Sequence, residues 1–252
     1  MNLFRNIFLL VLCVAATLPS YGQEMTMFDV AERFTCEELL ARLDRFSLKV
    51  AYSPEPNVGE IILYAGPDPI ENAKHLKYLQ RYLDRRNIKD LITVTSAEPG
   101  NRFRIEFWTG PSSAKRTLES VPLNLKLAKV TRPIVFDTDV FEMYVDKGKR
   151  LFVGYYCAAC CISNLDWNLL SQILVANPNL NTYLVIRGKA SRHRLLAAQI
   201  KDYMRDADLD KKKVKFLYAN KNIASSNDLS EFAIYLTPGR IRSARELRWD
   251  TE

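Results

Sequence analysis

The chain has 252 residues and a formal net charge of +7, with 48% of its residues hydrophobic and 26% charged. This composition is ordinary for a globular protein and excludes a chain that is disordered throughout. The length allows two domains of roughly 100 residues each, and no apolar run after the N-terminal segment approaches the roughly 20 residues of a membrane-spanning helix.

Residues 1–22 have the pattern of a secretory signal peptide. Arg5 supplies a positive start, residues 7–18 form an apolar core, and small residues precede a cleavage position after Gly22. We therefore expect an extracytoplasmic protein (periplasmic, cell-surface or secreted) that has no nucleic acid as a partner. Lipidation of Cys13 is the alternative for this segment. The basic charge leaves cell-wall polymers, anionic lipid surfaces or an acidic protein open as partners, and a solvated, mildly basic surface is the alternative.

Residues 23–111 have the pattern of a first α/β unit. Thr35 is suited to cap a helix that carries Glu37 and Glu38 in its first turn, where acids interact favourably with the helix dipole. The other expected elements are a strand near Met27, a strand at Ile61–Ala65, a helix at Glu71–Arg86, and strands at Leu91–Thr95 and Arg102–Trp108.

Residues 112–132 are predicted to be a linker, because prolines and serines interrupt any regular period, with a short apolar element at residues 123–130. A second α/β unit is expected over residues 133–239. Its expected elements are strands at Pro133–Phe136 and Leu151–Tyr156, a helix at Leu165–Val175, a strand at Tyr183–Ile186, a helix at Leu195–Met204, and strands at Val214–Leu217 and Glu231–Leu236.

Residues 240–252 form a basic C-terminal tail. Arg242, Arg245 and Arg248 recur in it at helical spacing, and Trp249 follows them. This pattern predicts either a solvated terminal helix or a basic amphipathic docking helix.

An internal repeat relates the two units. The stretch Pro56–Gly66 returns without a gap as Pro178–Gly188, 122 residues later. In both copies a Pro-Asn turn leads into an apolar strand that stops at glycine, and an amphipathic helix follows. We therefore expect an α/β (α+β) two-layer sandwich, duplicated in tandem, in which helices pack on one face of a mixed sheet.

The order of elements resembles that of the C-terminal domain of outer-membrane protein A, a peptidoglycan-binding family. Residues 82–88 (Tyr-Leu-Asp-Arg-Arg-Asn-Ile) are similar to a helix end in that family, and residues 101–107 (Asn-Arg-Phe-Arg-Ile-Glu-Phe) are similar to its closing strand. Residues 36–44 also resemble a stretch of uncharacterised secreted bacterial proteins with the same layout. The resemblance implies a degenerate tandem of OmpA-like domains.

The same resemblance implies where a ligand site would lie. The family binds peptidoglycan through an Asp after the first strand and an Arg in the next helix. In this chain Asp68 stands one position early between two prolines, and His75 occupies the Arg position beside Lys74. Asp68, Lys74 and His75 are therefore the candidate ligand-binding residues of the first unit. The alternatives are a turn residue for Asp68 and a surface helix position for His75.

Four cysteines follow the signal segment, namely Cys36, Cys157, Cys160 and Cys161. An even number in an exported protein predicts disulfides, and four cysteines allow three pairings. A redox dithiol at the Cys157-x-x-Cys160 spacing and a zinc site are the alternatives, although a second Cys-x-x-Cys is lacking. We therefore expect no metal and no cofactor.

The sequence contains no catalytic motif: His-Glu-x-x-His, Gly-x-Ser-x-Gly and the phosphate loop are all missing. We therefore expect a non-catalytic exported interaction protein, either a structural subunit of an envelope or surface assembly or a binder within one. Its expected partner is an envelope protein complex or a cell-wall component. The alternatives are peptidoglycan binding by the first unit and a thiol- or metal-dependent activity at the Cys157–Cys161 cluster.

Overall fold

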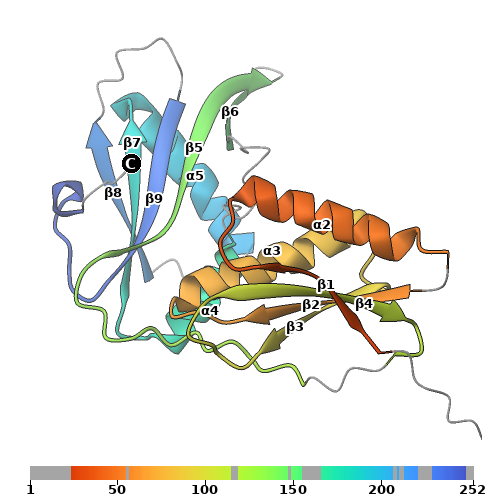
Figure 1. Ribbon diagram of the computed structural model, residues 1–252. Helices are drawn as coiled ribbons and strands as arrows, with labels where there is room; N and C mark the ends of the chain where they lie inside the picture. Colours follow the sequence, from red (N-terminus) through yellow and green to blue (C-terminus); the bar gives the residue numbers. More distant parts are fainter. Residues whose placement is uncertain are drawn as a thin grey trace, which may run out of the picture.

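The computed structural model describes residues 24–54, 57–114, 119–146, 149–154, 166–206, 209, 213–220 and 229–247. These residues form two mixed sheets, each with helices packed on one face (Figure 1). The expected α+β sandwich in two units is therefore confirmed.

The first unit contains a four-stranded sheet of order β1-β4-β2-β3. The strand β4 is antiparallel to both of its neighbours, whereas β2 and β3 are parallel and are joined through the crossover helix α3. The elements are β1 (Thr26–Ala31), α2 (Cys36–Ala51), β2 (Asn57–Tyr64), α3 (Pro69–Arg86), β3 (Ile92–Ala97) and β4 (Arg104–Pro111).

The second unit contains a five-stranded sheet of order β6-β5-β9-β7-β8. Its strands β5, β9, β7 and β8 pair with the same directions as β1, β4, β2 and β3, and β6 is added at the β5 edge. The elements are β5 (Ile134–Asp146), β6 (Lys149–Gly154), α4 (Trp167–Ala176), β7 (Asn181–Gly188), α5 (Ala190–Asp206), β8 (Val214–Asn220) and β9 (Leu229–Thr237).

Helices α2, α3 and α4 begin where a polar side chain accepts hydrogen bonds from their first N–H groups. Thr35 forms a capping box with Glu38: the Glu38 N–H donates to Thr35 Oγ1 at 3.2 Å, and the Thr35 N–H donates to Glu38 Oε2 at 2.7 Å. Asp68 caps α3 and Asp166 caps α4 by accepting hydrogen bonds from N–H groups of the first turn, without a reciprocal capping box. The expected cap of the first helix is confirmed.

The register of the repeat differs by one residue from the expected offset of 122. Ile61 pairs with Phe107 and faces the helices of the first unit, while Leu184 pairs with Ile234 and faces the helices of the second. Ile61 therefore corresponds to Leu184, whereas the sequence offset places it on Tyr183, which lies on the opposite face. A slip of one residue exchanges the two faces of a strand. Because both faces of β7 are apolar, the sequence pattern could not detect the slip.

The linker is fastened to both units, and no helix or strand lies in it between residues 119 and 133. The expected short apolar element at residues 123–130 forms no regular secondary structure, but its residues Leu123, Leu125 and Leu127 pack against the core of the second unit. The Val121 N–H donates to the Ser96 carbonyl at 2.8 Å, on the edge strand of the first sheet. The Asn177 amide accepts from the Leu127 N–H at 2.9 Å and donates to the Leu125 carbonyl at 2.8 Å, on the side of the second unit.

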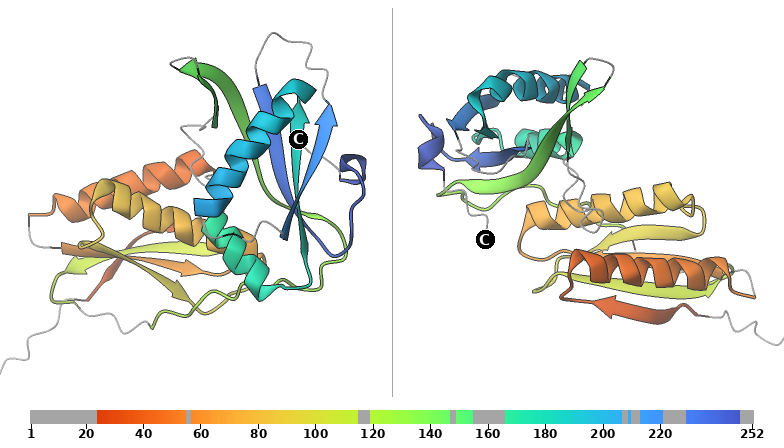
Figure 2. Two further views of the ribbon diagram at one scale, coloured as in Figure 1. Left: turned by 180° about the vertical axis from the view of Figure 1, so that it is seen from behind. Right: turned by 90° about the horizontal axis from the view of Figure 1, so that it is seen from above.

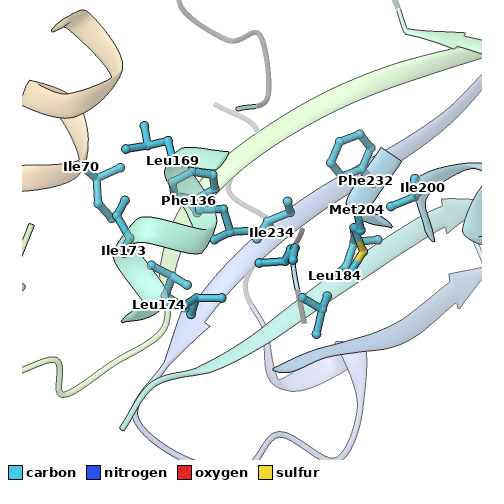
Figure 3. Packing of buried hydrophobic residues seen from close by; sticks show 14 of the residues in the cluster. Ile70, Phe136, Leu169, Ile173, Leu174, Leu184, Ile200, Met204, Phe232 and Ile234 are labelled. Atoms are coloured by element: carbon cyan, nitrogen blue, oxygen red, sulfur yellow. The ribbon is translucent and has the colours of Figure 1, made fainter. Parts of the chain in front are cut away.

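The two units meet where α3 lies against α4 (Figure 2). Ile70 of α3 belongs to the same buried cluster as Phe136, Leu169 and Ile173 of the second unit (Figure 3). Ala73 of α3 belongs to this cluster as well. The other face of α3 covers the sheet of its own unit. The helix α3 therefore packs in the core of the first unit with one face and in the core of the second unit with the other.

Candidate functional site

The loop between β2 and α3 is the place where the resemblance puts a ligand site. The buried Asn72 side chain fixes this loop, because its Nδ2 donates to the Gly66 carbonyl and its Oδ1 accepts from the Gly66 N–H, both at 2.9 Å. A Cβ on Gly66 would lie 2.9 Å from the backbone nitrogen of Phe103. The loop is therefore packed closely against the segment that leads into β4.

Asp68 acts on its own helix. Its Oδ1 accepts from the N–H groups of Ile70 at 2.8 Å and Glu71 at 3.2 Å, as an N-cap residue does. Pro69 at the first helical position fits this geometry, because a proline there removes no helical hydrogen bond. A ligand that bound Asp68 would share it with the start of α3.

Lys74 lies in the contact between the units. Its ammonium group donates to the Phe136 carbonyl, lies 3.4 Å from the Asp137 carboxylate and lies 4.9 Å from the centre of the Phe136 ring. The Asp137 side chain is only 6% exposed. Burial raises the pKa of Asp137, and the charge of Lys74 opposes that rise. Lys74 therefore supplies the countercharge of a buried carboxylate in the other unit.

His75 points into the aromatic part of the first core. Its ring centre lies 4.6 Å from that of Phe103 and 5.6 Å from that of Phe34, and its Nδ1 donates to the Glu71 carbonyl at 2.9 Å. Burial lowers the pKa of His75 below its ordinary value, because the charged form loses hydration. Burial therefore favours the neutral form of the ring over the charged form.

These three candidate residues have separate partners. Asp68 accepts hydrogen bonds from backbone N–H groups of α3. Lys74 forms an ion pair with Asp137 of the second unit, and the ring of His75 packs against Phe103 of the first unit. Peptidoglycan binding through them stays a prediction. A ligand that reached Lys74 would have to displace Asp137.

A Phe-Asp pair recurs in the first strand of each unit. Phe28-Asp29 in β1 and Phe136-Asp137 in β5 each lie at a β-bulge, opposite equivalent positions of β4 and β9. Each aspartate also accepts a hydrogen bond from the N–H of the next residue, at 2.8 Å and 3.0 Å respectively. The repeated Phe-Asp dipeptide is visible in the sequence, but its meaning depends on aligning two strands that resemble each other in little else.

The two equivalent aspartates have different partners. Asp29 is bound within its own unit by Arg42 at 2.6 Å and Arg45 at 3.0 Å, both on α2. Asp137 is bound across the contact by Lys74. The duplicated position thus stabilises one unit internally and joins the two units to each other.

The face of the first sheet opposite its helices carries a polar and aromatic group, the Glu106 cluster, made of Tyr64, Arg104, Glu106 and Trp108. Glu106 Oε1 lies 3.1 Å from the Arg104 guanidinium, and Oε2 accepts from Trp108 Nε1 at 2.9 Å and from the Tyr64 hydroxyl at 3.3 Å. The Arg104 guanidinium also stacks 4.3 Å from the centre of the Tyr64 ring. Both carboxylate oxygens of Glu106 are therefore engaged by side chains of the same face.

The equivalent face of the second sheet is covered by the tail segment, defined here as residues 240–247. Its residues Ile241, Ala244 and Leu247 pack in one cluster with the sheet residues Tyr183, Val185, Ala233 and Tyr235. The tail segment contains only a short 3-10 helix, η3 (Ala244–Glu246). The described part of the tail is therefore neither a solvated helix nor a free docking helix, because its apolar residues lie on the sheet.

The cysteine predictions fall mostly outside the described residues. Cys36 is the first residue of α2, and its thiol is free and partly buried. Cys157, Cys160 and Cys161 lie outside the described residues, so the disulfide, redox and zinc alternatives stay predictions. Within the described ranges, no group of three or more His, Cys, Asp or Glu side chains is placed to hold a metal ion.

An open hollow of about 330 Å³ lies beside the linker, between residues 126–130, residues 176–180 and Pro238. None of the candidate ligand residues lines it. No helix in the described part of the chain is both long enough and apolar enough to cross a membrane. Comparison with protein-family models and with curated proteins gives no match for this chain.

Proposed function

We propose that this chain is a non-catalytic, exported interaction protein that acts as a structural subunit of an envelope or surface assembly, or as a binder within one. The observation that carries the proposal is the shared core in which Ile70 and Ala73 of the first unit pack with Leu169 and Ile173 of the second. A shared core couples the motions of two units, because separating them would expose this apolar surface to water. The chain can therefore hold two sheet faces at a fixed spacing.

The two faces are suited to different partners. The first carries the Glu106 cluster, with Tyr64 and Trp108 partly exposed around a satisfied carboxylate. The second is covered by the tail segment, whose arginines Arg240, Arg242 and Arg245 are exposed. Two dissimilar surfaces on one body favour a protein that connects components.

The OmpA-like relationship is part of the proposal, and peptidoglycan binding is the alternative that it implies. The engagement of Asp68, Lys74 and His75 in the fold counts against that alternative. Co-sedimentation with purified sacculi tests it: binding by the wild type that Asp68→Ala abolishes would support an inherited site.

The thiol alternative depends on Cys157, Cys160 and Cys161. Mass spectrometry under non-reducing conditions distinguishes it from a scaffold. Closed bridges favour a structural role, whereas a reactive thiol or a bound metal favours chemistry.

Co-purification from the native envelope tests the proposed scaffold function. We expect one envelope component to accompany the wild type at a fixed ratio. Ile70→Asp should lower this ratio, because it places a charge in the shared core and uncouples the units. Val175→Asp is the matched control, since Val175 is 72% exposed on α4. Equal recovery with all three proteins, or no partner for any of them, would contradict the proposal.

A further inference from the structure

The outer surface of the tail segment is strongly basic. Arg240, Arg242 and Arg245 are all exposed, while the apolar residues between them face the sheet. Lys215 of the adjacent strand β8 lies with its ammonium group 5.5 Å from the centre of the Tyr183 ring, on the same face. The tail segment therefore exposes three arginines and one acid, Glu246, and it lies on the sheet face on which Lys215 approaches Tyr183.

The backbone that carries these arginines is held in place. The Ile241 N–H donates to the Tyr183 hydroxyl at 2.8 Å, which ties the segment to the middle of the sheet face. Glu246 Oε1 accepts from the N–H groups of Arg242 at 3.0 Å and Ser243 at 2.9 Å, which closes the turn. Leu247, only 4% exposed, anchors the other end. The positive charges thus project from a fixed platform.

We propose that this arginine surface binds the phosphate headgroups of an acidic lipid bilayer. A guanidinium group matches the geometry of a phosphate, because it donates two parallel hydrogen bonds. A protein partner would need an apolar or aromatic anchor at the centre of the contact, and the apolar residues of the tail segment already pack on the sheet. A plane of closely spaced phosphates instead engages several arginines at once. The inference rests on the proposed export and names one component that the scaffold would contact.

Co-sedimentation of the purified protein with lipid vesicles tests this inference. We expect binding to vesicles that contain phosphatidylglycerol and little binding to phosphatidylcholine alone. Each basic residue near an acidic bilayer strengthens the partition coefficient roughly fivefold. The triple variant Arg240→Gln/Arg242→Gln/Arg245→Gln should therefore bind roughly 100-fold more weakly. Raising the salt concentration to about 0.5 M should weaken wild-type binding as well.

A control variant with the same loss of charge distinguishes the effect of this arginine surface on vesicle binding from the effect of the net charge of the protein. Lys49, Arg85 and Arg102 are exposed cations of the first unit, and their combined replacement by Gln should leave vesicle binding within about threefold of the wild type, because charges beyond a Debye length of roughly 10 Å from the membrane contribute little. Thermal unfolding of both triple variants checks that each is folded.

Three results would overturn the inference. One is equal binding to acidic and neutral vesicles, and another is an equal loss of binding in both triple variants. The third is arginine-dependent binding of soluble polyphosphate without binding to vesicles. Because vesicle binding uses only purified protein and lipid, it can fail while the envelope co-purification succeeds, and the reverse also holds.

Discussion

The two units share one strand order but present different helix surfaces. Counted from their N-caps, α2 has Glu38 and Arg42 at the third and seventh positions, where α4 has Leu169 and Ile173. Glu38 is exposed to solvent, while Leu169 and Ile173 are buried in the shared core. At these two positions α2 carries polar residues, whereas α4 carries apolar residues that pack in the shared core. The two sheets beneath these helices keep the same strand order.

The partner surface on α3 shows the same specialisation. At an offset of 121, where Leu79 and Ile200 are both buried, Ile70 of α3 corresponds to Ser191 of α5. Ser191 is exposed, whereas Ile70 is buried against the second unit. The position of α5 that corresponds to Ile70 therefore carries no apolar docking residue, just as α2 carries Glu38 where α4 carries Leu169.

Ile70→Asp should have the largest effect on the stability of the contact between the two units. Burying an aliphatic side chain contributes about 1.5–3 kcal/mol, and a buried, unpaired charge adds a penalty. We expect the free energy of unfolding to fall by about 3 kcal/mol or more. The wild type should show a single calorimetric transition and the variant two, because the units of the variant no longer unfold together. The first core should survive, since Ile70 belongs to the shared cluster. Val175→Asp, at an exposed position of α4, should keep the single transition.

Lys74→Met should have the next largest effect, and its size should depend on pH. Removing one partner of a buried ion pair costs about 3–5 kcal/mol, and the partial exposure of Lys74 lowers our expectation to about 2 kcal/mol at pH 7. Burial already raises the pKa of Asp137 above its unfolded value, and loss of the lysine charge raises it further. The folded variant therefore binds a proton more readily than the unfolded chain, so its stability falls as pH rises from about 4 towards neutrality.

Denaturant unfolding of Lys74→Met and wild type at pH 4.5 and 7 measures this difference. The deficit of the variant should be larger at pH 7. A deficit that is equal at both pH values, or larger at pH 4.5, would show that Lys74 does not neutralise Asp137.

Leu247→Ala should destabilise the second sheet alone. Leu247 is 4% exposed and packs on Tyr183 and Tyr235, so its truncation should cost about 2 kcal/mol. Hydrogen exchange should accelerate for amides of β7 and β9 and stay unchanged for β2 and β4, whose open face has the Glu106 cluster instead. Uniform acceleration in both sheets would mean that the tail segment supports the whole molecule and not one face.

The smallest effect that we expect is the contribution of His75 to the pH dependence of stability. Burial lowers the pKa of His75, so the unfolded chain binds the proton more readily below its ordinary value of 6.5. Stability should therefore fall as pH decreases through that value, with a slope of at most about 1.4 kcal/mol per pH unit. His75→Phe should remove this part of the slope between pH 7 and 5, as measured by thermal unfolding. An unchanged slope would place the acid sensitivity elsewhere.

Local signals in the sequence were sufficient to predict the α+β sandwich in two units, but not the register between the two units. Thr35 with Glu38, and Asp68 before Pro69, identify two helix starts through hydrogen bonds made within a few residues. The apolar strands and their order follow from period and spacing, which also depend on near neighbours. The duplicated sandwich could therefore be predicted before the strand pairing was known.

The candidate site could not be predicted in the same way, because it depends on contacts between distant residues. Lys74 and Asp137 form an ion pair although 62 residues lie between them in the sequence. No local sequence pattern predicts that pairing. The sequence pointed to Asp68, Lys74 and His75 through resemblance, and the structure gives each a role in the fold. One signal was available: α4 is apolar on more than one side, which is typical of a helix buried between two layers.

A double-mutant cycle between Lys74 and Asp137 tests most directly whether the second unit is held on α3 of the first. The variants are Lys74→Met, Asp137→Asn and their combination, and the matched control replaces Asp137→Asn by Asp29→Asn at the equivalent bulge of the first unit. We predict a coupling energy of about 1–2 kcal/mol for Lys74 with Asp137, and a value within about 0.5 kcal/mol of zero for Lys74 with Asp29. No coupling in the first cycle, or equal coupling in both, would contradict the account.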